Sequence, residues 1–138
     1  MIIKEETDRK VNIESLLTDE YIIYQSGRIT GSKSPEGNQK WIIKEIMNGY
    51  FVLAIKDTRN GQYKFLTVRK RKLSFSKDKP GDSNNCLNYL FKYTENENKD
   101  NTNKLIHNVT NKAVFCKEDT KRFKRLCGAR DAREIKFV

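Results

Sequence analysis

A run of positive charge between residues 64 and 72 is the clearest chemical signal in the chain. Five of these nine residues are basic and none is acidic: Lys64, Arg69, Lys70, Arg71 and Lys72. Four adjacent charges cannot be buried, so the stretch from Arg69 to Lys72 must leave the core. Such a cluster attracts anions, most plausibly a phosphate backbone, and lysine and arginine bind it in a salt-sensitive way. The alternative is that the charges only protect a sheet edge from aggregation.

A second basic run lies near the C-terminus. It holds six basic residues in thirteen, opposed only by Asp131: Lys121, Arg122, Lys124, Arg125, Arg130 and Arg133. This composition is typical of a surface that contacts nucleic acid. The alternative is that these residues only form a solvent-exposed face. Tyrosines on an exposed sheet face stack on unpaired bases. Tyr24, Tyr50 and Tyr63 are candidates for that contact, unless they are half-buried packing residues.

Residues for catalysis or metal binding are sparse. No Ser-His-Asp order, Gly-rich phosphate loop or pair of carboxylates is recognisable, so we expect no enzyme activity and no cofactor. His107 and the three cysteines lack the short spacing of a zinc site, so no metal is expected. The chain has an odd number of cysteines, and their spacing is not that of a disulfide framework: Cys86, Cys116 and Cys127. This favours a reducing, cytoplasmic compartment.

Strands in the first half must position the first basic run. Residues 41 to 46, 50 to 56 and 63 to 68 are apolar runs separated by Asn48-Gly49 and Asn60-Gly61. Asn-Gly tolerates the positive φ angles of a two-residue hairpin, so these segments predict an antiparallel meander.

The flanking segments predict further short elements. Asn12 is expected to cap a short helix over residues 13 to 17. Strands are expected where β-branched and aromatic residues gather: residues 21 to 25, 73 to 75, 105 to 109, 113 to 116 and 135 to 138.

The length of 138 residues and these elements predict a mainly β (β-rich α+β) protein of one or two SH3-like barrels. Residues 77 to 86, which contain Pro80-Gly81, are expected to be a linker. A helix-plus-barrel domain would occupy residues 1 to 76, and a second small β-rich unit residues 87 to 138. Four identities at an offset of 62 residues favour tandem repeats. The alternative is one compact domain over residues 1 to 138.

The first half also resembles the WYL domain of bacterial transcription regulators. The resemblance covers residues 21 to 75 and rests on Ile22-Ile-Tyr24, Asn48-Gly-Tyr50-Phe-Val-Leu53-Ala, Asp57 and Gly61-Gln-Tyr63-Lys64-Phe. It implies an SH3-like barrel that senses nucleotides or nucleic acids. It also implies that Tyr24, Tyr50 and Lys64 line the ligand surface, with Lys70 near the family's last arginine.

Together these features predict a small, basic, non-catalytic module, of net charge +10, that binds RNA or single-stranded DNA. Electrostatic capture and tyrosine stacking would supply the binding. Two alternatives stay open: a protein-interaction module, such as a phage-encoded inhibitor of a host defence (CRISPR-type) nucleoprotein, and a sponge for nucleotide messengers. The longest uninterrupted apolar run is Tyr50 to Ile55, so neither a signal peptide nor a membrane span is expected.

Overall fold

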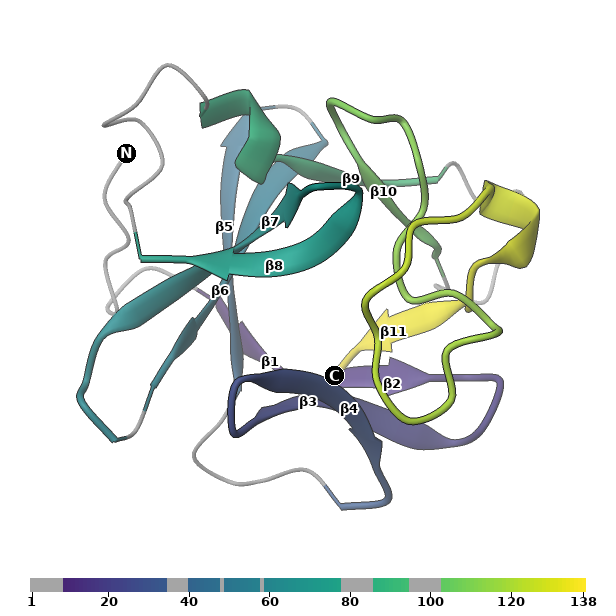
Figure 1. Cartoon of the computed structure of the whole chain (residues 1–138), viewed down its shortest axis with the longest axis horizontal. Helices are drawn as coiled ribbons and strands as arrows, with labels where there is room; N and C mark the ends of the chain where they lie inside the picture. Colours follow the sequence, from purple (N-terminus) through teal and green to yellow (C-terminus); the bar gives the residue numbers. More distant parts are fainter. Residues whose placement is uncertain (1–8, 35–39, 48, 58, 78–85, 95–102) are drawn as a thin grey trace.

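The computed structural model describes residues 9–34, 40–47, 49–57, 59–77, 86–94 and 103–138 (Figure 1). These residues form short strands and two 3₁₀ turns. The strands are β1 (Arg9–Val11), β2 (Ile13–Ser15), β3 (Glu20–Gln25), β4 (Arg28–Ser32), β5 (Trp41–Met47), β6 (Tyr50–Lys56), β7 (Tyr63–Arg69), β8 (Lys72–Ser76), β9 (Phe91–Tyr93), β10 (Leu105–His107) and β11 (Ile135–Phe137). The 3₁₀ turns are η1 (Cys86–Tyr89) and η2 (Ala129–Asp131).

The pairings close a six-stranded barrel from the two ends of the chain. β1 pairs with β5, β5 with β6, β6 with β9 and β9 with β10, all antiparallel. An antiparallel bridge between Asn103 and Ile135 joins the β10 segment to β11, and β11 pairs with β2. β1 and β2 are two parts of one bent strand, interrupted at Asn12, whose backbone exchanges hydrogen bonds with Val138. The ring therefore has no open edge between its first and last strands.

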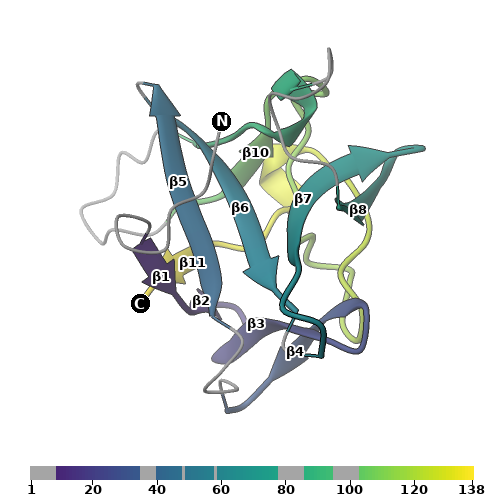
Figure 2. The same cartoon turned by 90° about the vertical axis from the view of Figure 1, so that its left-hand side faces the viewer.

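Three similar units build this barrel. In the first unit, β1/β2 and β5 belong to the barrel while β3 and β4 form a hairpin; in the second, β6 and β9 flank the β7–β8 hairpin. In the third, β10 and β11 flank a hairpin closed by the bridge between Ala113 and Cys127. Figures 1 and 2 show the β3–β4 hairpin, the β7–β8 hairpin and the yellow-green third hairpin projecting from the barrel strands.

The architecture corrects the fold expected from sequence. Residues 13 to 15 form strand β2 rather than a helix, because Ile13 and Ser15 alternate inward against β3 and β11. One barrel draws strands from both halves of the chain, so neither a single SH3-like barrel nor two tandem barrels is present. The two segments matched at an offset of 62 residues are also not equivalent, since Phe75 lies in hairpin strand β8 and Phe137 in barrel strand β11.

Several other sequence expectations are confirmed. The meander is β5, β6 and β7, the strand expected at residues 21 to 25 is β3, and those expected at 73 to 75 and 135 to 138 are β8 and β11. The strand expected at residues 105 to 109 is the shorter β10, and residues 113 to 116 form isolated bridges instead of the expected strand. Most of the expected linker, residues 78 to 85, lies outside the described residues, as does Asn48. Among the described residues, no helix is long and apolar enough to cross a membrane.

The turns differ from the two expected Asn-Gly hairpins. Gly49 has φ of 79°, and Met47 pairs with Tyr50, which fits a two-residue loop. Gly61 also has positive φ, but it belongs to a longer loop that runs from Asp57 to Gln62, whose backbones are hydrogen-bonded. A tight turn that the sequence did not predict joins β7 and β8, and its two residues, Lys70 and Arg71, both adopt positive φ. Glycine usually fills such positions.

The core fills the barrel and continues under the hairpins. Trp41, Phe51, Phe91 and Phe115 are almost completely buried, and the Trp41 indole donates a hydrogen bond to the Ile22 carbonyl. Burying aromatic side chains of this size contributes a large part of the stability of a small domain. The core thus fixes the bases of all three hairpins.

Candidate ligand-binding site

A pocket of about 310 Å³ opens where the three hairpins meet. Backbone hydrogen bonds hold the hairpins together there: the Phe123 amide donates to the Ile29 carbonyl, and the Leu73 amide donates to the Lys124 carbonyl. The Thr30 hydroxyl also donates to the Lys121 carbonyl. The lining residues come from all three hairpins and their flanks: Tyr24, Gly27, Arg28, Ile29, Lys64, Leu73, Ser74, Phe75, Lys77, Arg122, Phe123 and Lys124.

The lining is cationic, and the described residues that form it include no carboxylate. Arg28, Lys77, Arg122 and Lys124 are exposed. Within the described part of the chain, the side chains of these four residues form no ion pair or hydrogen bond. The site therefore presents positive charge that this part of the protein does not neutralise.

One wall of the pocket is fixed by the fifth cation, Lys64. Its ammonium donates to the Tyr24 hydroxyl at 3.0 Å and pairs with the Asp57 carboxylate at 3.2 Å. These contacts raise the pKa of Lys64, the bond to Tyr24 most strongly, so it stays charged. Asp57 also accepts from the Arg59 amide and guanidinium, and these bonds lower the pKa of Asp57 to about 2. This network orders the hydroxyl and ammonium groups of the wall.

The Asp57 network predicts an acid-dependent stability contribution. A carboxyl whose pKa is lower in the folded protein stabilises it above the ordinary pKa of 3.8, and the contribution is lost as the pH falls through about 2. We expect Asp57→Asn to lower the free energy of unfolding at about pH 6, and we expect the difference from the parent to shrink near pH 2. Urea unfolding at both pH values measures this.

The matched control is Asp131→Asn, which changes an exposed carboxylate in η2. It should change stability little at either pH. If the loss of unfolding free energy in Asp57→Asn stays constant down to pH 2, the lowered pKa assigned to Asp57 is contradicted.

The first basic run divides between the pocket and a hairpin tip. Lys64 lines the pocket, while Arg69 and Lys72 are paired across the end of the β7–β8 hairpin. Lys70 and Arg71 form its turn, and all four residues from Arg69 to Lys72 are exposed. The structure therefore does not gather Lys64 with the four-residue tip.

The second basic run is divided more sharply. Arg122 and Lys124 line the pocket, and Lys121 and Arg130 are exposed elsewhere. Arg125 pairs with Glu118 and Asp119. Arg133 is only 3% exposed, so it is a structural residue rather than part of a binding surface. Burial lowers its pKa, and hydrogen bonds hold its guanidinium in place.

The three candidate stacking tyrosines have different surroundings. Tyr24 is buried at the pocket wall, so its ring face is not free for a base; its ring makes a T-shaped contact with Phe75, with the ring centroids 5.0 Å apart. Tyr50 and Tyr63 are half-buried and pack against an outer apolar cluster around Val52. Sequence reasoning missed Arg28 and Lys77, since each is an isolated charge whose role appears only when the hairpins meet.

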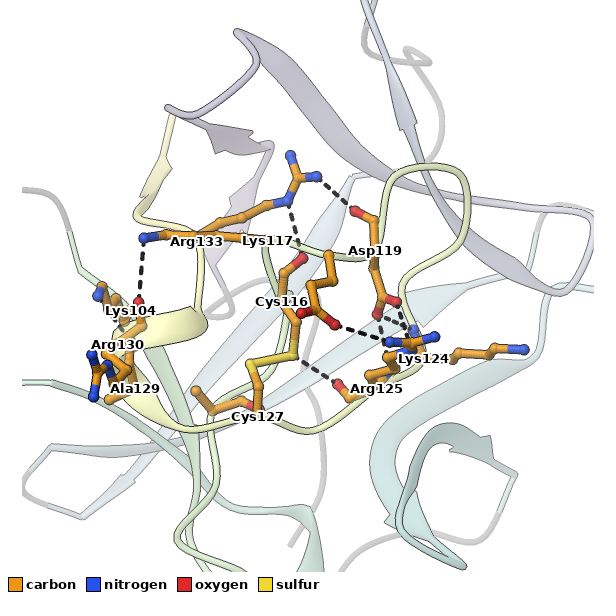
Figure 3. Close-up of a disulfide and its surroundings, with 12 residues drawn as sticks. Lys104, Cys116, Lys117, Asp119, Lys124, Arg125, Cys127, Ala129, Arg130 and Arg133 are labelled. Atoms are coloured by element: carbon orange, nitrogen blue, oxygen red, sulfur yellow. Dashed lines mark hydrogen bonds and ion pairs between the residues drawn. A yellow bond between two sulfur atoms is a disulfide. The ribbon is translucent and has the colours of Figure 1, made fainter.

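A disulfide between Cys116 and Cys127 spans the hairpin that supplies Arg122 and Lys124 (Figure 3). Its Cα atoms are 6.1 Å apart. The spacing of the three cysteines did not indicate this pair, because the two residues come together only when the third hairpin forms. Beside it, Asp119 accepts hydrogen bonds from the Lys124 and Arg125 amides, which fixes the loop backbone.

Solved structures match this arrangement along almost the whole chain. The designed three-fold symmetric protein ThreeFoil has a TM-score of 0.68 at 14% identity, covering 94% of this chain and 97% of that one. SeviL bound to asialo-GM1 saccharide has a TM-score of 0.68 at 13% identity, covering 96% of this chain and 98% of that one. The BEL β-trefoil has a TM-score of 0.65 at 11% identity, covering 93% and 90%. No family model and no curated protein matches the sequence.

These likenesses define the fold as a β-trefoil. They also correct the function inferred from sequence. The expected RNA- or single-stranded-DNA-binding module rested on the two basic runs, on tyrosine stacking and on an SH3-like barrel. The matched structures are instead β-trefoils, and one of them is bound to a saccharide. The segment that resembles a WYL domain is divided between the first two trefoil units.

Proposed function

We propose that this protein is a non-catalytic carbohydrate-binding module whose ligand occupies the pocket between the hairpins. The observation that carries the proposal is the lining of that pocket. Leu73 and Phe75 supply apolar surface, while the Tyr24 hydroxyl and the surrounding cations supply polar groups. Small-molecule sites combine apolar walls with a few fixed polar groups in this way. The saccharide bound to SeviL, a protein of the same fold, supports the choice of ligand class.

The same lining supports a role in binding rather than hydrolysis. Most glycoside hydrolases use a pair of carboxyl groups as acid and as nucleophile or base. The described residues that line the pocket include no aspartate, glutamate, histidine or cysteine. Its groups are suited to holding a ligand by hydrogen bonds and charge.

A glycan array followed by calorimetry tests the proposal. We expect the protein to bind at least one class of saccharide. We expect Leu73→Trp to abolish that binding, because Leu73 lies on the same face of β8 as Phe75 and a larger side chain there would fill the pocket. The control is Gln62→Trp, which places the same side chain on the exposed loop between β6 and β7. Circular dichroism verifies that both variants fold. Absence of binding to every glycan would refute the proposed function, and unchanged binding by Leu73→Trp would refute the proposed site.

A further inference from the structure

We infer that the pocket selects an acidic saccharide, one that carries sulfate or carboxylate groups. The inference rests on the proposed function and names the class of ligand for the same site. It is carried by the convergence of charge from all three trefoil units. Arg28 comes from the first unit, Lys77 from the second, and Arg122 and Lys124 from the third.

Among the residues that the structure describes, the nearby carboxylates Asp57 and Asp119 have other partners and do not neutralise this charge. Asp57 holds Lys64 and Arg59, and Asp119 accepts the amides of the loop that bears Lys124. Like charges gathered without a counter-charge repel each other, and a bound anion relieves that repulsion. A neutral sugar would leave the four cations uncompensated.

The backbone that carries these cations is held rigidly although their side chains are exposed. The Lys124 amide and carbonyl are both hydrogen-bonded, to Asp119 and Leu73, and the neighbouring Phe123 amide bonds to Ile29. The disulfide closes the same hairpin. Fixed anchor points lower the entropic cost of binding, which favours a defined anionic group over loosely held counterions.

The shape of the site separates it from a general polyanion surface. The residues at the tip of the β7–β8 hairpin, Lys70 and Arg71, are exposed and do not line the pocket. The pocket is lined by the apolar side chains of Leu73 and Phe75 and by Tyr24 as well as by the cations. A sulfate or carboxylate would reach the cations while the ring to which it is attached contacts the apolar and hydroxyl groups. A simple ion lacks the second set of contacts.

Calorimetric titrations test this with four probes: a sulfated oligosaccharide, an unsulfated uronic-acid oligosaccharide, a neutral oligosaccharide of equal length, and poly-glutamate. The pocket variant is the triple change Arg28→Gln, Arg122→Gln and Lys124→Gln. The control triple, Lys10→Gln, Lys112→Gln and Lys136→Gln, removes the same charge from exposed residues that do not line the pocket. We expect the pocket triple to weaken binding of an acidic saccharide about tenfold or more, and the control to leave it nearly unchanged. The two acidic probes show whether sulfate or carboxylate is preferred.

Each other outcome overturns a defined part of the account. If the neutral saccharide binds as tightly as the acidic ones, and the pocket triple binds it with unchanged affinity, the acidic selectivity is overturned and the proposed carbohydrate function is left intact. Poly-glutamate binding as tightly as the acidic saccharides, with the same loss in the pocket triple, would overturn the carbohydrate function and leave an anion site. Equal losses in both triples would show that net charge alone drives binding, and no binding of any probe would overturn both proposals.

Discussion

Replacing Arg133 with methionine is expected to destabilise the protein by about 3 kcal/mol. The buried guanidinium donates to the carbonyls of Cys116 and Asp119 and to the hydroxyls of Ser15 and Thr18. It also lies 4.9 Å from the centre of the Phe123 ring. These contacts join the first trefoil unit to the third. Methionine fills much of the volume but leaves buried acceptors without donors, and each such loss costs about 1–3 kcal/mol.

Urea unfolding measures the effect, and Arg130→Met is the control. Arg130 lies three residues earlier and is exposed, so its replacement should change stability by less than about 0.5 kcal/mol. Equal, small effects of the two changes would contradict the structural role given to Arg133. A large effect for Arg133→Met alone would confirm that this residue is part of the framework and not of the binding surface.

Loss of the disulfide is expected to cost a similar amount, about 3 kcal/mol, and to weaken ligand binding as well. The bond joins residues eleven positions apart, and closing a loop of this size restricts the unfolded chain by about that free energy. Arg122 and Lys124 lie inside the loop, so its loosening should also reduce the order of the pocket. The double variant Cys116→Ala/Cys127→Ala removes the bond.

Thermal unfolding with and without dithiothreitol provides the comparison. The parent should lose stability in reductant down to the level of the double variant, and reductant should not affect the double variant. Mass spectrometry of the alkylated protein identifies the paired cysteines. The disulfide would be contradicted if the parent and the double variant were equally stable without reductant. It would also be contradicted if Cys116 and Cys127 both carried free thiols.

Local patterns in the sequence predicted many strands but not the way they close. β3, β5, β6, β7 and β8 follow from apolar and β-branched runs, whose signal is short-range. Closure depends on β11 meeting β2 and on the bridge from Asn103 to Ile135, contacts that no local pattern encodes. The 62-residue offset favoured two repeats on the strength of four identities. The third unit has short, irregular hairpin strands, in which isolated bridges replace a full ladder, so it has no comparable strand pattern in the sequence.

The candidate site was only partly predictable for a similar reason. Arg122 and Lys124 belong to a visible basic run, yet their neighbours Lys121 and Arg125 lie outside the pocket. Arg133 belongs to the same run but is buried, since its charge meets carbonyls rather than solvent. Charge density in the sequence predicts an anion-binding surface, whereas the geometry of the three meeting hairpins decides which charges come together.

The most direct test of the central claim is an NMR titration of the ¹⁵N-labelled protein with a sulfated oligosaccharide. The account predicts that shift changes gather on amides from all three hairpins: residues 27 to 29, 73 to 75 and 122 to 124. Saturation of these shifts at a single affinity would show that the hairpins form one site. Changes confined to the Lys70-Arg71 turn, or scattered over exposed lysines such as Lys10 and Lys136, would contradict it.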